Sequence, residues 1–110
     1  MGGVSIADSD AVRSLSKAVF GQELRIAVMV AIGESDGVFT LTNLAERLGV
    51  YSLSLIQKPL KSLEDAGLIE RMPSAGSRSV YFRRDESSSA WKFASELLER
   101  AMRSVNSGAG

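Results

Sequence analysis

Apolar residues recur with a helical period in the middle of the chain. A first group repeats at steps of three and four residues, the spacing that places side chains on one helix face. Its members are Leu41, Leu44, Ala45 and Leu48. Thr42 can cap this helix, because its hydroxyl can accept a backbone N–H of the first turn. Gly49 follows directly and is typical of a left-handed stop. The pattern therefore predicts a short amphipathic helix that ends at Gly49.

A second helix follows after a short turn, with Ile56, Leu60 and Leu63 stacked on one side. Gly67 ends it, and Leu68 is the apolar residue expected to pack back over a glycine-terminated helix. The opposite face carries polar and basic side chains that the helical spacing brings together. These are Ser54, Gln57, Lys58 and Lys61. Such a face suits the major groove of DNA and its phosphates. A solvated surface is the alternative, because these residue types are also common there.

Two short runs rich in β-branched and aromatic residues come next, at residues 68–72 and 79–83. They flank the sequence PSAGSR, which is a turn-forming cluster. Two such runs around a turn predict a β-hairpin. The middle of the chain thus combines a helix-turn-helix with a hairpin.

The sequences LAERLGV, LKSLEDAGLIE and SVYFR, at their mutual spacings, resemble the winged-helix repressors of the ArsR and MarR type. The resemblance covers roughly residues 20–84. In such proteins the second helix enters the major groove and the wing lies over the adjacent backbone or minor groove. The resemblance therefore implies a DNA-binding transcriptional regulator, with helix 53–66 in the groove and residues 73–79 as the wing.

The remaining elements complete a predicted fold. Residues 1–8 are small and Gly-containing, and we expect them to be disordered. Ser9 can cap a helix that runs to Phe20, and its apolar face is Val12, Leu15, Ala18 and Val19. A second helix from Gln22 to about Ile32 and a short strand at 38–40 precede the helix-turn-helix. We expect a mainly α fold with a small β-hairpin, in the order α-α-β-α-α-β-β-α.

The last helix, from Ala90 to about Val105, carries a wide apolar stripe of helical period. A serine of the preceding run at 87–89 can cap it. The stripe either packs on its own domain or forms a homodimer, and dimerisation is favoured because a minimal winged helix is closed without this helix. Repressors of the resembled type dimerise through their terminal helices. The expected interface is Leu15, Trp91, Phe93, Ala94, Leu97, Leu98 and Ala101. We therefore expect one domain over residues 9–105 and a disordered tail at 106–110.

Two features depart from the family pattern. One residue more than usual separates Gly49 from Leu60, and Pro59 sits inside the recognition helix. A proline beyond the first helical turn removes a hydrogen bond and clashes with the preceding turn, at a cost of ~3 kcal/mol. We therefore expect an extended turn through residues 51–53 and an irregular first turn or kink before Pro59.

Composition narrows the possible functions. The chain has no Cys and no His, which excludes disulfides, thiolate or imidazole metal sites and His-based catalysis. No cofactor is expected, and no spacing of Ser, Lys, Tyr and carboxylates suggests an enzyme. No apolar run approaches the roughly 18 residues that span a bilayer, and the N-terminus lacks a secretory pattern. We expect a cytoplasmic protein without a membrane partner.

Net charge is zero, yet the charge is unevenly distributed. Between residues 58 and 84 there are six basic and three acidic residues. This places positive charge in the segment assigned to DNA. The effector and the operator are not readable from the sequence.

Two functions remain open. The first is a dimeric, sequence-specific repressor that binds double-stranded DNA. Gln57 would read adenine, Lys58 would read guanine or bind phosphate, and the other residues would mainly contact the backbone. The expected contact residues are Ser52, Ser54, Gln57, Lys58, Lys61, Arg71, Arg78 and Arg83. The alternative is a winged-helix module that binds protein and not DNA.

Overall fold

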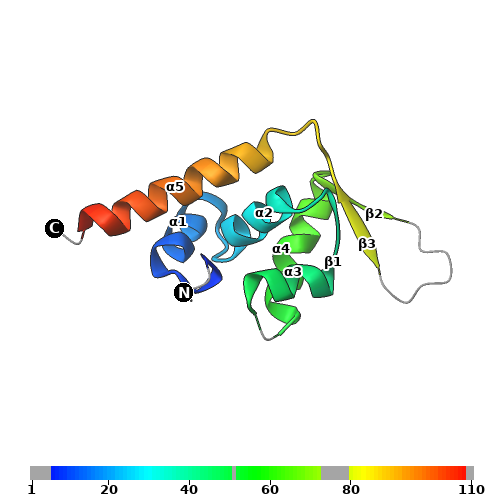
Figure 1. Ribbon diagram of the computed structural model, residues 1–110, viewed down its shortest axis with the longest axis horizontal. Helices are drawn as coiled ribbons and strands as arrows, with labels where there is room; N and C mark the ends of the chain where they lie inside the picture. Colours follow the sequence, from blue (N-terminus) through cyan, green and yellow to red (C-terminus); the bar gives the residue numbers. More distant parts are fainter. Residues whose placement is uncertain (1–5, 51, 73–79, 109–110) are drawn as a thin grey trace.

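The computed structural model describes residues 6–50, 52–72 and 80–108. Its elements follow one another as a 3-10 helix and α1 to α5, with a three-stranded sheet between them (Figure 1). Their bounds are η1 Ile6–Asp8, α1 Asp10–Phe20, α2 Arg25–Glu34, β1 Val38–Thr40, α3 Leu41–Leu48, α4 Ser54–Asp65, β2 Ile69–Met72, β3 Tyr81–Arg84 and α5 Ala90–Gly108. The predicted order of helices and strands is confirmed, with η1 as an addition. Ile6 packs half-buried against the core, where we had expected disorder through residue 8.

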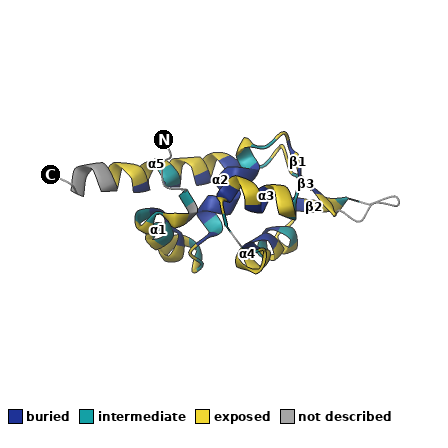
Figure 2. Cartoon of the chain, turned by 60° about the horizontal axis from the view of Figure 1, so that its bottom comes forward, coloured by how far each residue is buried: buried dark blue, intermediate teal, exposed yellow. Residues whose placement is uncertain are grey.

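Helix α2 forms the centre of the molecule. All seven residues from Ile26 to Ile32 are buried, and α1, α3, α4 and α5 pack around them (Figure 2). A helix that is apolar on every side is stable only inside a core. The sequence predicted its existence, but the helix starts at Arg25 and not at Gln22. The side chain of Gln22 instead accepts a hydrogen bond from the Leu24 N–H at 2.7 Å.

Helix α1 begins as predicted, because the Ser9 hydroxyl accepts the Val12 N–H at 3.3 Å. Its buried face differs from the expected one: Val12 is buried, but Val19 is 44% exposed. Ser16 lies on the core face and is fully buried. Its hydroxyl donates to the Gln22 carbonyl at 2.5 Å and accepts the Ile26 N–H at 3.1 Å. This hydroxyl therefore satisfies a first-turn donor of α2 that has no partner within its own helix.

The helix-turn-helix comprises α3 and α4. Thr40, and not Thr42, caps α3, because its hydroxyl accepts the Asn43 N–H at 3.0 Å. The helix begins at Leu41, so Thr42 lies already within its first turn. Gly49 ends it in the left-handed conformation, with φ 72°, as predicted. After α4, the Leu68 N–H bonds back to the Leu63 carbonyl at 3.0 Å.

Pro59 lies inside α4 without ending it. The first turn of the helix is irregular, as expected, because the Leu55 and Ile56 N–H groups bond three residues back, to Ser52 and Leu53. Tyr51, part of the extended turn that we predicted, is outside the described residues. The Pro59 ring is fully buried. Its apolar contact with the core offsets part of the missing hydrogen bond.

The sheet has the strand order β1-β3-β2, and both pairings are antiparallel. Phe39 on β1 lies opposite Phe82 on β3, and the two rings stack with centroids 5.7 Å apart. The short first strand therefore pairs with the wing. Both aromatic rings point into the core and fix the wing strands to the helices.

Helix α5 covers α2 and α1 (Figure 1). The Ser88 hydroxyl accepts the Ala90 N–H at 3.0 Å near its start, so a serine of the 87–89 run does cap this end. Its buried residues are Trp91, Ala94, Leu97 and Ala101. The Trp91 indole N–H donates to the Asp85 carbonyl at 2.9 Å. The core is therefore not closed by the preceding elements, and α5 belongs to it.

Arg84 ties the root of the wing to the end of α2. Its Nη1 donates to the carbonyls of Ile32, Gly33 and Ser35 at 2.7, 2.9 and 2.9 Å. A cation at a helix C-terminus is favoured because it meets the exposed carbonyls and the negative end of the helix dipole. The wing strands therefore have a fixed attachment to the core.

Candidate nucleic-acid interface

The face of α4 that points away from the core is polar. Ile56, Leu60 and Leu63 are buried, whereas Gln57 and Lys58 on the other side are exposed. Ser52 is half-buried and its hydroxyl lies 2.8 Å from that of the exposed Ser54. The predicted contact residues of this helix therefore do share one outward face. The sequence did not suggest that Leu53 and Leu55, 41% and 40% exposed, would stand beside them.

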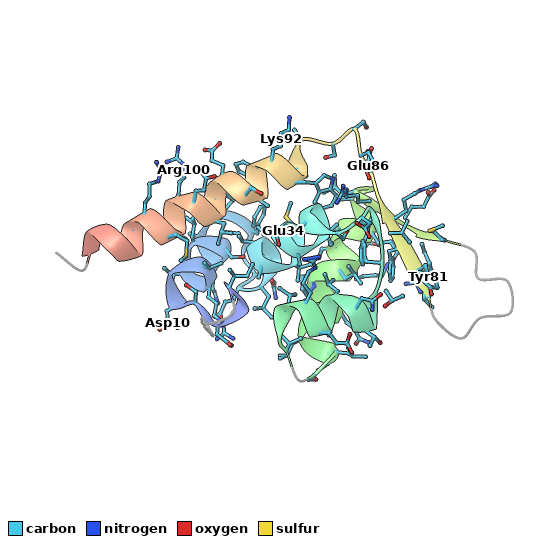
Figure 3. The ribbon with its side chains drawn as sticks, viewed as in Figure 1. Asp10, Glu34, Tyr81, Glu86, Lys92 and Arg100 are labelled. Atoms are coloured by element: carbon cyan, nitrogen blue, oxygen red, sulfur yellow. The ribbon has the colours of Figure 1, made fainter. Side chains whose placement is uncertain are left out.

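A groove of about 300 Å³ separates α4 from the wing strands. Its walls combine apolar side chains with an amide and an ion pair. They are Leu41, Gln57, Leu60, Lys61, Glu64, Arg71, Val80 and Phe82. Tyr81, 41% exposed, stands at the end of β3 that is farther from α5 (Figure 3). The helix and the hairpin thus form the two sides of one surface.

Arg71 spans this groove from β2 to α4. Its Nε and Nη2 donate to the two carboxylate oxygens of Glu64, each at 3.2 Å. The guanidinium carbon also lies 5.1 Å from the centroid of the Phe82 ring, close enough for a cation–π contact. The hydrogen bond from Arg71 lowers the pKa of Glu64, and the same bond raises the pKa of Arg71. Arg71 is therefore already engaged within the chain.

Lys61 is engaged in a similar way. Its Nζ donates to the Asp65 carboxylate at 2.6 Å, and this bond raises the pKa of Lys61. The spacing of four residues makes such a pair predictable. The spacing of seven residues from Glu64 to Arg71 crosses a helix end and is not a recognisable signal. Among the described cations of α4, β2 and β3, Lys58 alone has no carboxylate partner.

Arg83 lies apart from this surface. Side chains alternate between the two faces of a strand, and its neighbours Phe82 and Arg84 both point to the core side. Arg83 points to the other face of the sheet, where its Nη2 donates to Glu70 at 2.6 Å. The structure thus separates Arg83 from the α4 surface with which the sequence had grouped it. Arg78 and the predicted wing loop at 73–79 are outside the described residues.

The residues expected at a dimer interface fall into two sets. Trp91, Ala94, Leu97 and Ala101 are buried inside the chain itself, so their apolar character is explained without a partner. Leu15 and Leu98 are half-buried. Phe93 is 45% exposed and meets Phe20 edge-on, with ring centroids 6.3 Å apart. The outer surface of α5 is polar: Lys92 and Arg100 point away from the body of the molecule (Figure 3).

The part of the chain that the structure describes contains no cluster of three carboxylates able to hold a metal ion. Among these same residues, no helix combines the length and apolarity that crossing a bilayer requires.

No protein-family model matches the sequence, and no curated protein matches it either. Solved structures do match the fold. RdhR, described as an organohalide-sensing transcriptional regulator, aligns in its ligand-free form with a TM-score of 0.70 and 17% identity. Its form bound to 2,4-dichlorophenol gives 0.69 and 16%. These alignments cover 89% and 88% of this chain and 60% of the RdhR chain, so this chain spans about 60% of the length of that regulator.

Two further structures are similar. ZitR of Lactococcus lactis aligns with a TM-score of 0.56 and 20% identity, over 87% of this chain and 68% of ZitR. NadR in complex with 4-hydroxyphenylacetate gives 0.54 and 22%, over 90% of this chain and 70% of NadR. At these identities the likeness establishes the fold. The chain is a winged helix, mainly α with a small antiparallel sheet, as the sequence predicted.

Proposed function

We propose that this chain is a transcriptional regulator that binds double-stranded DNA through α4 and the wing. One observation carries the proposal: the outward face of α4 presents Gln57 and Lys58 beside the wing, with the opposite face of the helix buried in the core. A helix held rigidly in this way can enter the major groove, which is wide enough to admit it. The description of RdhR as a transcriptional regulator supports the proposal.

Each residue of the face has a proposed role. Gln57 is suited to adenine, because a carboxamide can form paired hydrogen bonds with it. Lys58 is suited to guanine or to a phosphate. The hydroxyls of Ser52 and Ser54 are suited to the backbone, which positions the protein without reading sequence. The amine of Lys61 is suited to the same role once it leaves Asp65. Arg78 in the wing is proposed as a further phosphate contact.

The proposed regulator is a homodimer that acts as a repressor by occupying an operator. The burial of Leu97 and its neighbours moves the proposed interface to the apolar side chains that remain on the surface of α1 and α5. These are Val19, Phe93 and Met102, which are 44%, 45% and 44% exposed, with Leu98 beside them. Phe93→Glu and Met102→Glu should each leave the fold intact and weaken self-association in analytical ultracentrifugation. A wild type that sediments as a monomer at micromolar concentration would contradict the dimer.

Selection of bound sequences from a random duplex pool, followed by a salt titration, tests DNA binding. Enriched sequences should form an inverted repeat with half-site centres about 10 base pairs apart, because a two-fold dimer meets successive major grooves. If Lys58 and Arg78 of both subunits neutralise four phosphates, log affinity should fall with log salt at a slope of about −4, at roughly 0.9 per contact.

Two variants complete the test. Lys58→Ala should weaken binding and flatten the slope, whereas Lys92→Ala, which removes a cation from the outer surface of α5, should change neither. A flat response to salt for every duplex would contradict the proposal. It would favour instead a winged-helix module that binds another protein.

A further inference from the structure

The groove between α4 and the wing contains an arginine, Arg71, that could bind a phosphate but is already paired with Glu64. Arg71 is half-exposed, with 54% of its side chain accessible, whereas Glu64 is 25% exposed. Of the two side chains that line the groove, the arginine is therefore the more accessible to a partner. Two parallel N–H···O bonds join them.

Carboxylate and phosphate compete for the same donors. An arginine presents its paired N–H groups to either anion in the same planar geometry. While Nε and Nη2 donate to Glu64, they cannot donate to a phosphate. The Phe82 ring beneath the guanidinium also restricts its plane, so that turning toward DNA would break two contacts at once.

A second cation of the same surface is also paired, because the neighbouring residue Asp65 holds Lys61 on α4. The surface therefore carries cations whose attraction for a polyanion is largely cancelled by carboxylates of the same surface. Affinity that comes from phosphates alone is independent of sequence. A surface whose charges are cancelled has little of this sequence-independent affinity.

We infer that Glu64 is a specificity-determining residue of the proposed DNA interface. By holding Arg71 it withholds a cation from the phosphates, so that tight binding depends on the base contacts of α4. Glu64 thus lowers the affinity for DNA of every sequence, and the base contacts then favour the operator over other sites. This inference rests on the proposed DNA-binding function.

Glu64→Gln tests the inference, because it keeps the shape of the side chain and removes its charge. With Arg71 released, affinity for random duplex DNA should rise by roughly fivefold or more, and the salt slope should steepen by about 0.9 per subunit. Affinity for the selected operator should rise less, so that the ratio of specific to random binding falls. Asp65→Asn, which releases Lys61, should shift random binding in the same direction.

Arg71 must be the cause of the gain. Arg71→Ala alone should change random binding little, because the cation is occupied in the wild type. In the Glu64→Gln background the same substitution should abolish the gain. Glu96→Gln is the matched control, because Glu96 pairs with Arg100 at 3.1 Å on α5, away from α4, and its removal should leave DNA binding unchanged.

The outcomes separate the two proposals. A wild type that binds no duplex at any salt concentration would reject the DNA-binding function itself. A wild type that binds DNA, combined with a gain that persists in the Glu64→Gln/Arg71→Ala double variant, would overturn the inference, because Glu64 would then act by simple repulsion. Unchanged or weaker binding by Glu64→Gln would overturn it as well, since the ion pair would then only support the wing. Thermal unfolding of each variant verifies that the fold is retained.

Discussion

Two contacts in this molecule, that of α5 with α2 and that of α4 with the wing, depend on different forces. Where α5 lies on α2, the contact is apolar: Ile26–Ile32 on one side meet Ala94, Leu97 and Ala101 on the other, and all are buried. Where α4 lies beside the wing, an accessible ion pair between Glu64 and Arg71 joins the two. The first contact depends on shape and excluded water. The second depends on charges that remain accessible to solvent, salt and competing anions.

The apolar contact therefore determines the stability of the fold, whereas salt and bound anions can alter the ionic contact. Apolar burial fixes the relative position of the helices and contributes most of the free energy of folding. The ion pair contributes little to stability, yet it sits where the proposed partner would bind. Substitutions in the two contacts should therefore have effects of different size and of different kind.

The largest effect is expected from the apolar contact. Leu97→Ala should lower the free energy of unfolding by about 2–5 kcal/mol, because it leaves a cavity between α5 and α2. Urea unfolding followed by circular dichroism measures the change. Met102→Ala, at a position that is 44% exposed, is the matched control and should cost under about 1 kcal/mol. Equal effects of the two substitutions would break the comparison, since α5 would then not be part of the core.

A polar group inside the apolar half gives the next effect. Ser16→Ala should destabilise the chain by about 1–3 kcal/mol, because the Ile26 N–H and the Gln22 carbonyl lose their shared partner. Thermal unfolding of this variant and of Ser14→Ala, which removes an exposed hydroxyl from the same helix, isolates the contribution of burial. If both variants unfold at the wild-type temperature, the buried hydroxyl has no stabilising role.

The ionic contact should contribute less. Glu64→Gln should lower the free energy of unfolding by under about 1 kcal/mol at low salt, as is usual for accessible ion pairs. The difference from the wild type should shrink further in high salt, because mobile ions screen the pair. Leu97→Ala should keep its full effect under the same conditions. A salt-independent loss in Glu64→Gln would show that packing, and not charge, joins α4 to the wing.

The smallest expected effect is a dependence on pH. Because Arg71 lowers the pKa of Glu64 in the folded chain, the unfolded chain binds the proton more readily. The stabilisation is therefore present above the unfolded pKa, about 4.3 for Glu, and is lost as pH falls through the lower folded value. The stability difference between the wild type and Glu64→Gln, measured by urea unfolding at pH 7 and at successively lower pH, should shrink as the pH falls below the unfolded value.

Much of the fold could be predicted from local signals. Gly49 and Gly67 mark helix ends because each adopts a positive φ, 72° and 79°, which glycine tolerates best. The hairpin followed from its apolar runs and turn residues. The cap of α3 was placed on Thr42 and not on Thr40, because both threonines can accept a first-turn N–H and the sequence does not show where the first turn begins.

What could not be predicted depends on tertiary approach. The stripe of α5 showed that the helix has an apolar face, but periodicity does not reveal whether the face meets α2 or a second chain. The burial of Ser16 could not be predicted either, because only the contacts with Gln22 and Ile26 make a buried hydroxyl favourable. The pairing of Arg71 with Glu64 likewise requires β2 to lie against α4. The sequence therefore indicated which residues of α4 face outward, but it did not show which cations of this surface are paired with carboxylates.

The tie made by Arg84 bears on how long the native state persists. Its three acceptors lie 49 to 52 residues earlier in the sequence, so the tie closes only after α2 has formed and the hairpin has docked. Contacts that form after the folding transition state influence unfolding more than folding. We therefore expect Arg84→Met to accelerate unfolding in stopped-flow experiments while the refolding rate changes little. An equal slowing of refolding would show that the hydrogen bonds of Arg84 form before the folding transition state. On this basis the root of the wing sets the lifetime of the folded chain.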